Sequence, residues 1–169
     1  PGGTFSDWAW GTPTKTVINN AATGTKCWIV GGLTGSAYND GEASWLQSPC
    51  FDFTNLQYPV IDFKAWWESE RNFDGTGLQY SINNGTSWSD VGSVSEPRDC
   101  FYVNWYNTPS VRYLTLMQSG SGWSGSSSGW VAAKKALPTL AGKSNVIFRF
   151  VFGAGTINNN FDGFAIDDF

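Results

Sequence analysis

The chain has 169 residues, a formal net charge of −4 and no histidine. This length is typical of one domain that can bury a sizeable hydrophobic core. The lack of histidine excludes Ser-His-Asp and Cys-His catalysis and the usual zinc sites. The sequence has no basic patch and no apolar run near the ~20 residues that span a bilayer, so we expect neither nucleic-acid binding nor membrane insertion.

Aromatic residues make up 17% of the chain and include ten Trp, whereas charged residues make up 14%. Twenty Gly and many Asn, Ser and Thr indicate numerous turns. Cys27, Cys50 and Cys100 lack the spacing of a zinc or redox motif. One disulfide with a free thiol and three free thiols are both compatible with this count, so the pairing stays open.

The first half of the chain contains several short β-type runs, at residues 16–19, 26–30 and 44–53. Residues 60–70 form the clearest predicted strand, because apolar and polar side chains alternate along it. Ile61 and Phe63 belong to the face predicted to enter the core. Trp66 belongs to the opposite, polar face, so we expect it on an outer surface or in a groove.

The second half continues this pattern. Asn84-Gly85 predicts a hairpin turn between residues 78–82 and 86–88. Residues 145–153 and 161–169 are predicted strands, the second of which must pair with a strand met earlier in the chain. Residues 131–140 could form a helical turn, although Pro138 argues against a long helix. Many short strands separated by turns predict an all-β, antiparallel two-sheet β-sandwich (jelly roll), forming one domain over residues 1–169.

Several motifs, taken in order, resemble those of a known domain family. They lie at residues 10–13, 48–53, 66–70, 84–88, 148–150 and 162–168. Together they resemble the MAM-like jelly-roll domains, including cleaved-adhesin domains, of secreted Bacteroidetes surface proteins. The resemblance implies an extracellular or cell-surface accessory module of a larger protein, often calcium-stabilised and often glycan-binding. Related jelly rolls often begin with Phe-Glu, the Glu being a calcium ligand, whereas here Phe5 is followed by Ser6 and Asp7.

Calcium is therefore the expected cofactor, since Ca²⁺ prefers several carboxylate and carbonyl oxygens. Asp167 and Asp168 end the closing strand, and we expect them to face opposite sides of it. Related jelly rolls favour Asp167 as the ligand. Asp40 and Glu42 are the predicted partners, and Asp7 is a weaker one.

The aromatic residues predict a ligand-binding surface, because sugar rings stack on Trp and Tyr while their hydroxyls bind amide and carboxylate groups. Core packing is the competing explanation for each Trp taken singly. The predicted ligand-binding residues are Trp66, Glu68, Glu70, Arg71, Trp105, Tyr106, Trp123 and Trp130.

The sequence thus predicts a non-catalytic, calcium-stabilised module that binds a polysaccharide or surface glycan and contacts neighbouring domains of its parent protein. The first alternative is a structural or protein-binding adhesin module without glycan affinity. The second is a small glycan-active enzyme that uses Glu68 and Glu70, which share one face of their strand. Same-face neighbours on a strand lie about 6.5–7 Å apart, which permits but does not indicate paired-carboxylate catalysis.

Overall fold

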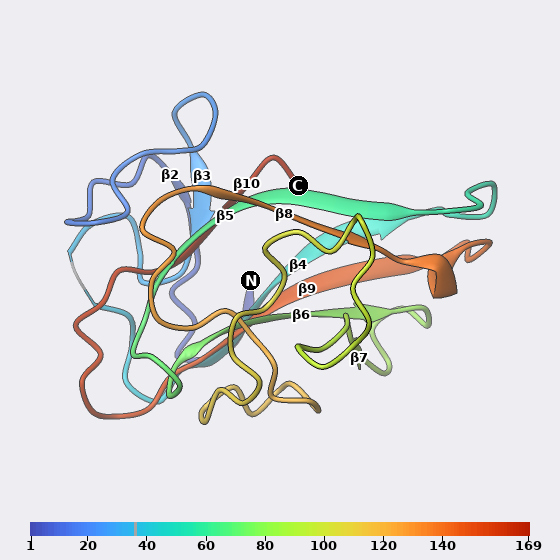
Figure 1. The fold of residues 1–169 in the computed structure, drawn as a ribbon. Helices are drawn as coiled ribbons and strands as arrows, with labels where there is room; N and C mark the ends of the chain where they lie inside the picture. Colours follow the sequence, from blue (N-terminus) through green and yellow to red (C-terminus); the bar gives the residue numbers. More distant parts are fainter. Residues whose placement is uncertain (36) are drawn as a thin grey trace.

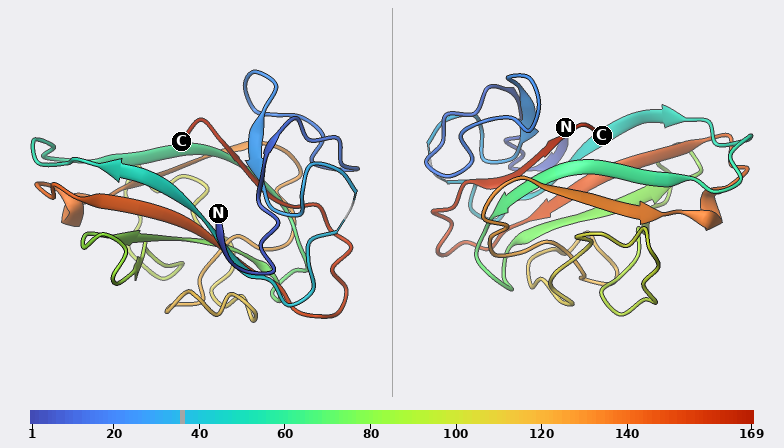
Figure 2. Two further views of the ribbon diagram at one scale, coloured as in Figure 1. Left: turned by 180° about the vertical axis from the view of Figure 1, so that it is seen from behind. Right: turned by 45° about the horizontal axis from the view of Figure 1, so that its top comes forward.

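A computed structural model describes residues 1–35 and 37–169. It consists of two five-stranded antiparallel sheets that pack face to face (Figures 1 and 2). This arrangement confirms the predicted all-β, jelly-roll-like sandwich. Within the described ranges the single helix is the 3₁₀ turn η1 (Pro138–Leu140), and no helix is long and apolar enough to cross a membrane.

Sheet A has the strand order β1-β4-β9-β6-β7, and sheet B has the order β2-β3-β10-β5-β8. In sheet A the strands are β1 (Gly2–Thr4), β4 (Ala43–Phe51), β9 (Val146–Gly153), β6 (Gly75–Ser81) and β7 (Ser89–Asp90). In sheet B they are β2 (Ala9–Gly11), β3 (Cys27–Ile29), β10 (Gly163–Asp167), β5 (Val60–Glu68) and β8 (Val131–Ala136). Segments from both ends of the chain therefore meet in the same sandwich.

The alternation along β5 decides which of its faces enters the core. Ile61, Phe63, Ala65 and Trp67 are all buried between the sheets, as predicted. Trp66 lies on the outer face of sheet B, also as predicted. In β9 seven of the eight residues are buried, because loops cover its outer face as well as its inner one.

β10 lies between β3 and β5 and pairs with both in antiparallel register. The closing strand therefore pairs with strands met earlier in the chain, as expected. Phe164 and Ile166 point from β10 into the main core, and Ala165 points to the opposite side. The strand ends at Asp167.

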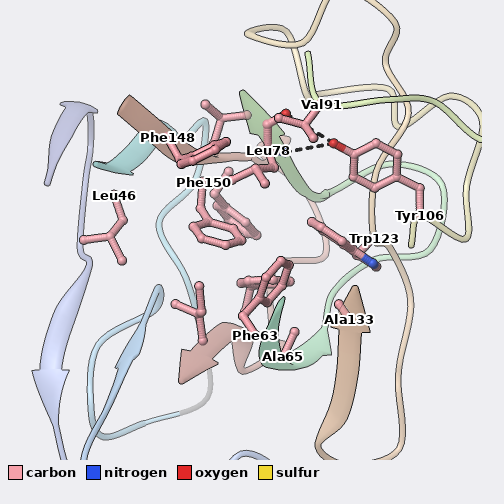
Figure 3. Packing of buried hydrophobic residues seen from close by; sticks show 14 of the residues in the cluster. Leu46, Phe63, Ala65, Leu78, Val91, Tyr106, Trp123, Ala133, Phe148 and Phe150 are labelled. Carbon is pink, nitrogen blue, oxygen red and sulfur yellow. Dashed lines mark hydrogen bonds between the residues drawn. The ribbon is translucent and has the colours of Figure 1, made fainter. Parts of the chain in front are cut away.

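The core between the sheets is rich in aromatic rings (Figure 3). Phe63 lies edge-on to Phe150, with ring centroids 5.0 Å apart. It also lies edge-on to Trp123, at 5.7 Å. Trp123 comes from the long connection between β7 and β8, whose backbone extends sheet A: Trp123 and Thr76 exchange two backbone hydrogen bonds of 2.8 and 3.0 Å.

A second, smaller core lies on the outer face of sheet B, where the segment between β2 and β3 covers Cys27, Ile29 and Ala165. Ile18 comes from this segment and is fully buried. The predicted strand at residues 16–19 is wrong, because the backbone N–H groups of Val17 and Ile18 donate to the Asp162 carboxylate instead of a sheet.

Two other local features differ from or complete the sequence-based expectations. Residues 131–136 form strand β8, so the predicted helical turn is confined to η1. Pairing with β5 outweighs the helix-favouring alanines in this stretch. Cys27, Cys50 and Cys100 are free thiols, of which Cys27 is buried and the other two are exposed.

Candidate functional site

A cleft opens between the two sheets, and we call it the aromatic cleft. It encloses about 480 Å³. Sheet A contributes Leu46, Phe148 and Phe150 to its apolar floor, and Ile166 of β10 closes it from sheet B. Because these side chains are core residues of both sheets, the cleft is an opening of the sandwich itself.

Two tryptophans form the rim of the aromatic cleft on the sheet B side. Trp10 of β2 stands opposite Trp28 of β3 in the strand register. Their ring centroids are 5.7 Å apart and the rings are tilted by 46°. Trp28 is half-buried against the main core, whereas half of the Trp10 surface is exposed (50%). Trp10 therefore offers an accessible aromatic ring above an apolar floor.

Polar groups stand at the same rim. Gln47 borders the rim from β4, just before a bulge in the β4–β9 pairing, but its side chain stands opposite Arg149 on the outer face of sheet A. Asp168 is also exposed, and its Oδ1 accepts a 2.6 Å hydrogen bond from the Thr23 hydroxyl. Phe169, 45% exposed, lies beside Asp168 and closes the far end of the cleft. An aromatic ring and a carboxylate thus border one cavity.

Three of the predicted ligand-binding residues are not on the surface. Trp105, Tyr106 and Trp123 are at most 3% exposed and pack on one another in the main core. Figure 3 shows Tyr106 and Trp123 side by side there. Their polar atoms bond to backbone: Trp105 to Val91, Tyr106 to Leu78, and Trp123 to Asn104. The prediction that they bind ligand is wrong, because burying their large apolar surface stabilises the fold far more than leaving it in water.

Trp66 and Trp130 pack together on the outer face of sheet B. Their ring centroids are 6.0 Å apart at 70°, and both rings border the smaller core. The Trp130 ring nitrogen donates to Asn20, at 3.1 Å to the side-chain oxygen. Within the described residues the Trp66 ring nitrogen is buried without a hydrogen-bond partner. These half-buried rings cover a core and offer less free surface than Trp10.

The predicted polar partners lie at the end of β5, away from the aromatic cleft. Glu68 Oε2 accepts a 3.1 Å hydrogen bond from the Asp162 N–H. Glu70 Oε1 accepts a 3.0 Å hydrogen bond from the Asn158 amide. Arg71 is exposed. The two carboxylates therefore hold the loop between β9 and β10.

The carboxylates of Asp162, Asp7, Glu68 and Glu42 lie close enough to the buried Lys15 for their charges to act on it, and we call these five residues the lysine cluster. Negative charge on each of the four carboxylates acts on Lys15. The Lys15 ammonium donates a 2.6 Å hydrogen bond to the Gly31 carbonyl. Burial lowers the pKa of Lys15, and the carboxylates oppose that shift. The cluster joins segments that lie far apart in the sequence.

Glu42 is the most buried carboxylate that the sequence nominated for calcium, with 1% of its surface exposed. Burial raises the pKa of Glu42 to about 8; the Ser44 hydroxyl, which donates to Oε1, opposes this shift, and the Asp7 charge adds to it. Among the described residues, Glu42 Oε2 and the Ser6 hydroxyl are buried without hydrogen-bond partners.

The four predicted calcium ligands do not form one site. Asp167 Oδ2 accepts from the N–H groups of Ala22 and Thr23, while Glu42 belongs to the lysine cluster with Asp162. Five residues of extended chain from 162 to 167 span about 16 Å, too far for one shared ion. Asp40, on the surface, accepts from the Asn159 amide.

Strand geometry predicted that Asp167 and Asp168 face opposite sides, and this prediction is wrong. Both carboxylates bond to Thr23, Asp167 through the backbone N–H and Asp168 through the hydroxyl. The reason is that the strand ends at Asp167, and Asp168 has a positive φ of 54° that turns the chain. In residues 1–35 and 37–169, no group of three or more His, Cys, Asp or Glu side chains is arranged to hold a metal ion.

The sequence-based list missed Trp10, Trp28 and Gln47. No local signal separates them from core residues, because their shared cleft depends on the pairing of β2 with β3 and on how sheet B faces β4.

The sequence matches no model of a known protein family, and a search of curated proteins finds none that is similar.

Proposed function

We propose that the chain is a non-catalytic, extracellular binding module that takes a carbohydrate in the aromatic cleft, as part of a larger secreted or surface protein. The observation that carries this proposal is the half-exposed ring of Trp10 above a cavity of about 480 Å³. This volume lies within the ~300–1,000 Å³ range of small-ligand sites.

The chemistry of the rim supports a sugar ligand. The apolar C–H face of a sugar ring stacks on an accessible Trp, and its hydroxyls need planar amide and carboxylate partners. Trp10 provides the ring, and Asp168 provides a carboxylate. Because Trp28 is tilted by 46° to Trp10, it serves as a side wall and not as a second coplanar platform.

The environment of Glu68 and Glu70 supports a module without catalytic activity. Glycoside hydrolysis needs two carboxyl groups on opposite sides of a scissile bond. Glu68 and Glu70 instead accept hydrogen bonds from Asp162 and Asn158 in one loop. The alternative is a structural or protein-binding adhesin module without glycan affinity.

Replacing Trp10 by alanine is expected to abolish glycan binding and leave the melting temperature nearly unchanged, since surface substitutions usually change stability by about 0.5 kcal/mol or less. A glycan array followed by calorimetric titration of the best ligand measures the effect. Phe5→Ala is the matched control, because Phe5 is 64% exposed and does not line the cleft. Full binding by Trp10→Ala, or silence of the wild type on a broad array, would contradict the proposal.

We also propose that calcium stabilises the module through Glu42 and Asp7. Burial raises the pKa of Glu42 to about 8, and a bound cation would favour its ionised form. In addition, Glu42 Oε2 has no hydrogen-bond partner among the described residues, and a carboxylate oxygen is a preferred calcium ligand. Bound calcium would neutralise these carboxylates at the end of the sandwich where the lysine cluster lies.

Adding calcium after EDTA treatment is expected to raise the melting temperature of the wild type, because a ligand that binds only the folded state stabilises it. Differential scanning calorimetry measures the shift. Glu42→Gln should remove the response, and Asp40→Asn should keep it, since exposed Asp40 bonds to Asn159 instead. A wild type that does not respond to calcium would mean that Lys15 is the cation of this cluster.

A further inference from the structure

A row of polar side chains crosses the outer face of sheet A. Gln47 of β4 stands opposite Arg149 of β9, and Arg149 stands opposite Gln79 of β6. Asp90 of β7 continues the row beside Gln79. Residues directly opposite one another on paired strands lie on the same face of a sheet. Because Phe150, the next residue of β9, lies in the core, the row faces away from the core.

Gln79 holds the Arg149 guanidinium in place. Gln79 is 1% exposed, and its Nε2 donates to Asp90 Oδ1 at 3.0 Å and to the Leu116 carbonyl at 2.7 Å. Its Oε1 accepts hydrogen bonds of 2.9 and 2.7 Å from Arg149 Nε and Nη2. Asp90 Oδ2 accepts from the Ser119 N–H, so both oxygens of this carboxylate are bonded to other groups. The guanidinium is therefore bonded to an uncharged amide.

Two tryptophans pack against the same guanidinium. Arg149 Cζ lies 4.1 Å from the ring centroid of Trp88 and 5.2 Å from that of Trp45. Trp45 also packs on β1, since a Cβ at Gly2 would come within 2.8 Å of its ring. A cation over an aromatic ring is attracted by the negative face of the ring. These contacts hold the cation without using its N–H groups.

Among the described residues, the positive charge of Arg149 has no carboxylate partner, because the ion pairs there involve Lys134 and Lys135. Burying a charge without an opposite charge is costly, and burial accordingly lowers the pKa of Arg149. In this part of the chain its guanidinium donates from Nε and Nη2 alone. The edge formed by Nη1 and the other Nη2 hydrogen therefore stays free. Two parallel N–H groups of this kind bind both oxygens of a carboxylate.

The groups around this free edge suit a sugar ring that carries the carboxylate. Gln47 is exposed in the same row, so its amide can bond to a sugar hydroxyl. Trp45 and Trp88 are partly exposed and offer apolar surface to the C–H groups of the ring. The net charge of the chain is −4, which disfavours unspecific binding of polyanions. Binding would therefore depend on this local cation.

We propose that the outer face of sheet A is a second glycan site, in which Arg149 binds the carboxylate of a uronic acid residue. Gln47 bonds to a hydroxyl of the same sugar, and Trp45 and Trp88 flank its ring. This site lies on one sheet, whereas the aromatic cleft lies between the two sheets. A glycan with acidic residues is thus the ligand expected here.

Trigalacturonic acid and its methyl ester test the proposal, because they share one sugar skeleton and differ in the charge of their carboxyl groups. In calorimetric titrations, the ester should bind the wild type about tenfold or more weakly than the acid, as expected for the loss of a charged hydrogen bond. Equal affinities, or no binding at millimolar acid, would overturn the proposal. A polyglutamate peptide that binds Arg149 more tightly than the sugar would overturn it in favour of a protein ligand.

Arg149→Met removes both the charge and the paired donors, so it should weaken binding of the acid about tenfold or more. Arg149→Lys keeps a charge without the planar fork and should bind with intermediate affinity. Arg112→Met is the matched control, because Arg112 also lies over two aromatic rings, those of Phe73 and Tyr113, but is exposed in the connection between β7 and β8. Equal affinities of Arg149→Met and Arg112→Met would overturn the proposal.

A second variant keeps the test valid even if Arg149→Met fails to fold. Gln47→Ala changes an exposed side chain and should weaken binding of trigalacturonic acid about threefold to tenfold, the effect of one neutral hydrogen bond. Unchanged affinity would overturn the role of Gln47. A neutral glycan that binds the aromatic cleft should not displace the acid, and displacement would overturn the assignment of two separate sites.

Discussion

Replacing Trp123 by alanine is expected to lower the free energy of unfolding by about 3–5 kcal/mol, the usual cost of removing a buried Trp or Phe. Trp123 is fully buried. Its ring contacts Phe63, Tyr106 and Phe164, with centroids 4.7–5.7 Å apart, and its ring nitrogen donates to the Asn104 carbonyl. The substitution would leave a cavity at the centre of the core and an unpaired carbonyl.

Urea unfolding followed by circular dichroism measures this loss. The free energy of unfolding of a whole domain is about 5–15 kcal/mol, so the expected loss is a large fraction of it. Partial unfolding of the variant at 37 °C would therefore agree with the prediction. Trp10→Ala is the matched control, because it removes the same side chain from a half-exposed position. A similar cost for both variants would contradict the separation of core and cleft tryptophans.

Lys15→Met is the second substitution with a large expected effect, a loss of about 1–3 kcal/mol, the usual cost of leaving a buried polar group without its hydrogen-bond partner. Methionine keeps most of the apolar stem but removes the ammonium, so the Gly31 carbonyl loses its 2.6 Å hydrogen bond. The substitution also removes a positive charge on which the charges of Asp162, Asp7, Glu68 and Glu42 act. Guanidinium unfolding at several pH values measures the effect.

The loss should depend on pH in a definite direction. Burial already raises the pKa of Glu42 in the folded wild type to about 8, above its unfolded value of about 4, and loss of the nearby ammonium should raise this pKa further. Between pH 4 and 8 the folded state of both proteins holds a proton that the unfolded chain releases, and above pH 8 the folded variant alone continues to hold it. The stability of the variant should therefore fall further below that of the wild type as the pH rises above about 8.

Lys134→Met is the control, because Lys134 forms an exposed ion pair with Asp62 at 2.7 Å. Exposed pairs contribute about 0–1 kcal/mol, so this variant should remain near wild-type stability at every pH. If Lys15→Met behaved like Lys134→Met, the lysine cluster would not stabilise the fold.

The positions of most strands along the chain could be predicted from the sequence, whereas their order in the two sheets could not. In β5 the alternation of residues 60–68 matches the alternation of burial, because strand side chains point to opposite faces. In β9 the run of Phe148, Phe150 and Phe152 is too apolar to lie anywhere but in the core. These signals are local, so they can be read without knowing what the strands pack against.

The position of each tryptophan could not be predicted in this way. The Gly/Ser-rich residues 119–129 look like a flexible loop, yet they place Trp123 at the centre of the core because Gly75 and Gly122 allow the backbones to approach closely. Trp10 also lies among small residues, yet it remains half exposed. The difference depends on which strand each backbone pairs with, and that pairing is not local.

The carboxylates show the same division. The sequence by itself determined the all-β architecture through alternation and turn residues, but it did not determine which acids lie together. The tertiary structure alone decided that Glu42, Asp162 and Glu68 meet around Lys15, while Asp167 and Asp168 bond to Thr23. The physical reason is that the two ends of an extended strand lie far apart. Which charged groups become neighbours therefore depends on how the strands pair and not on spacing along the chain.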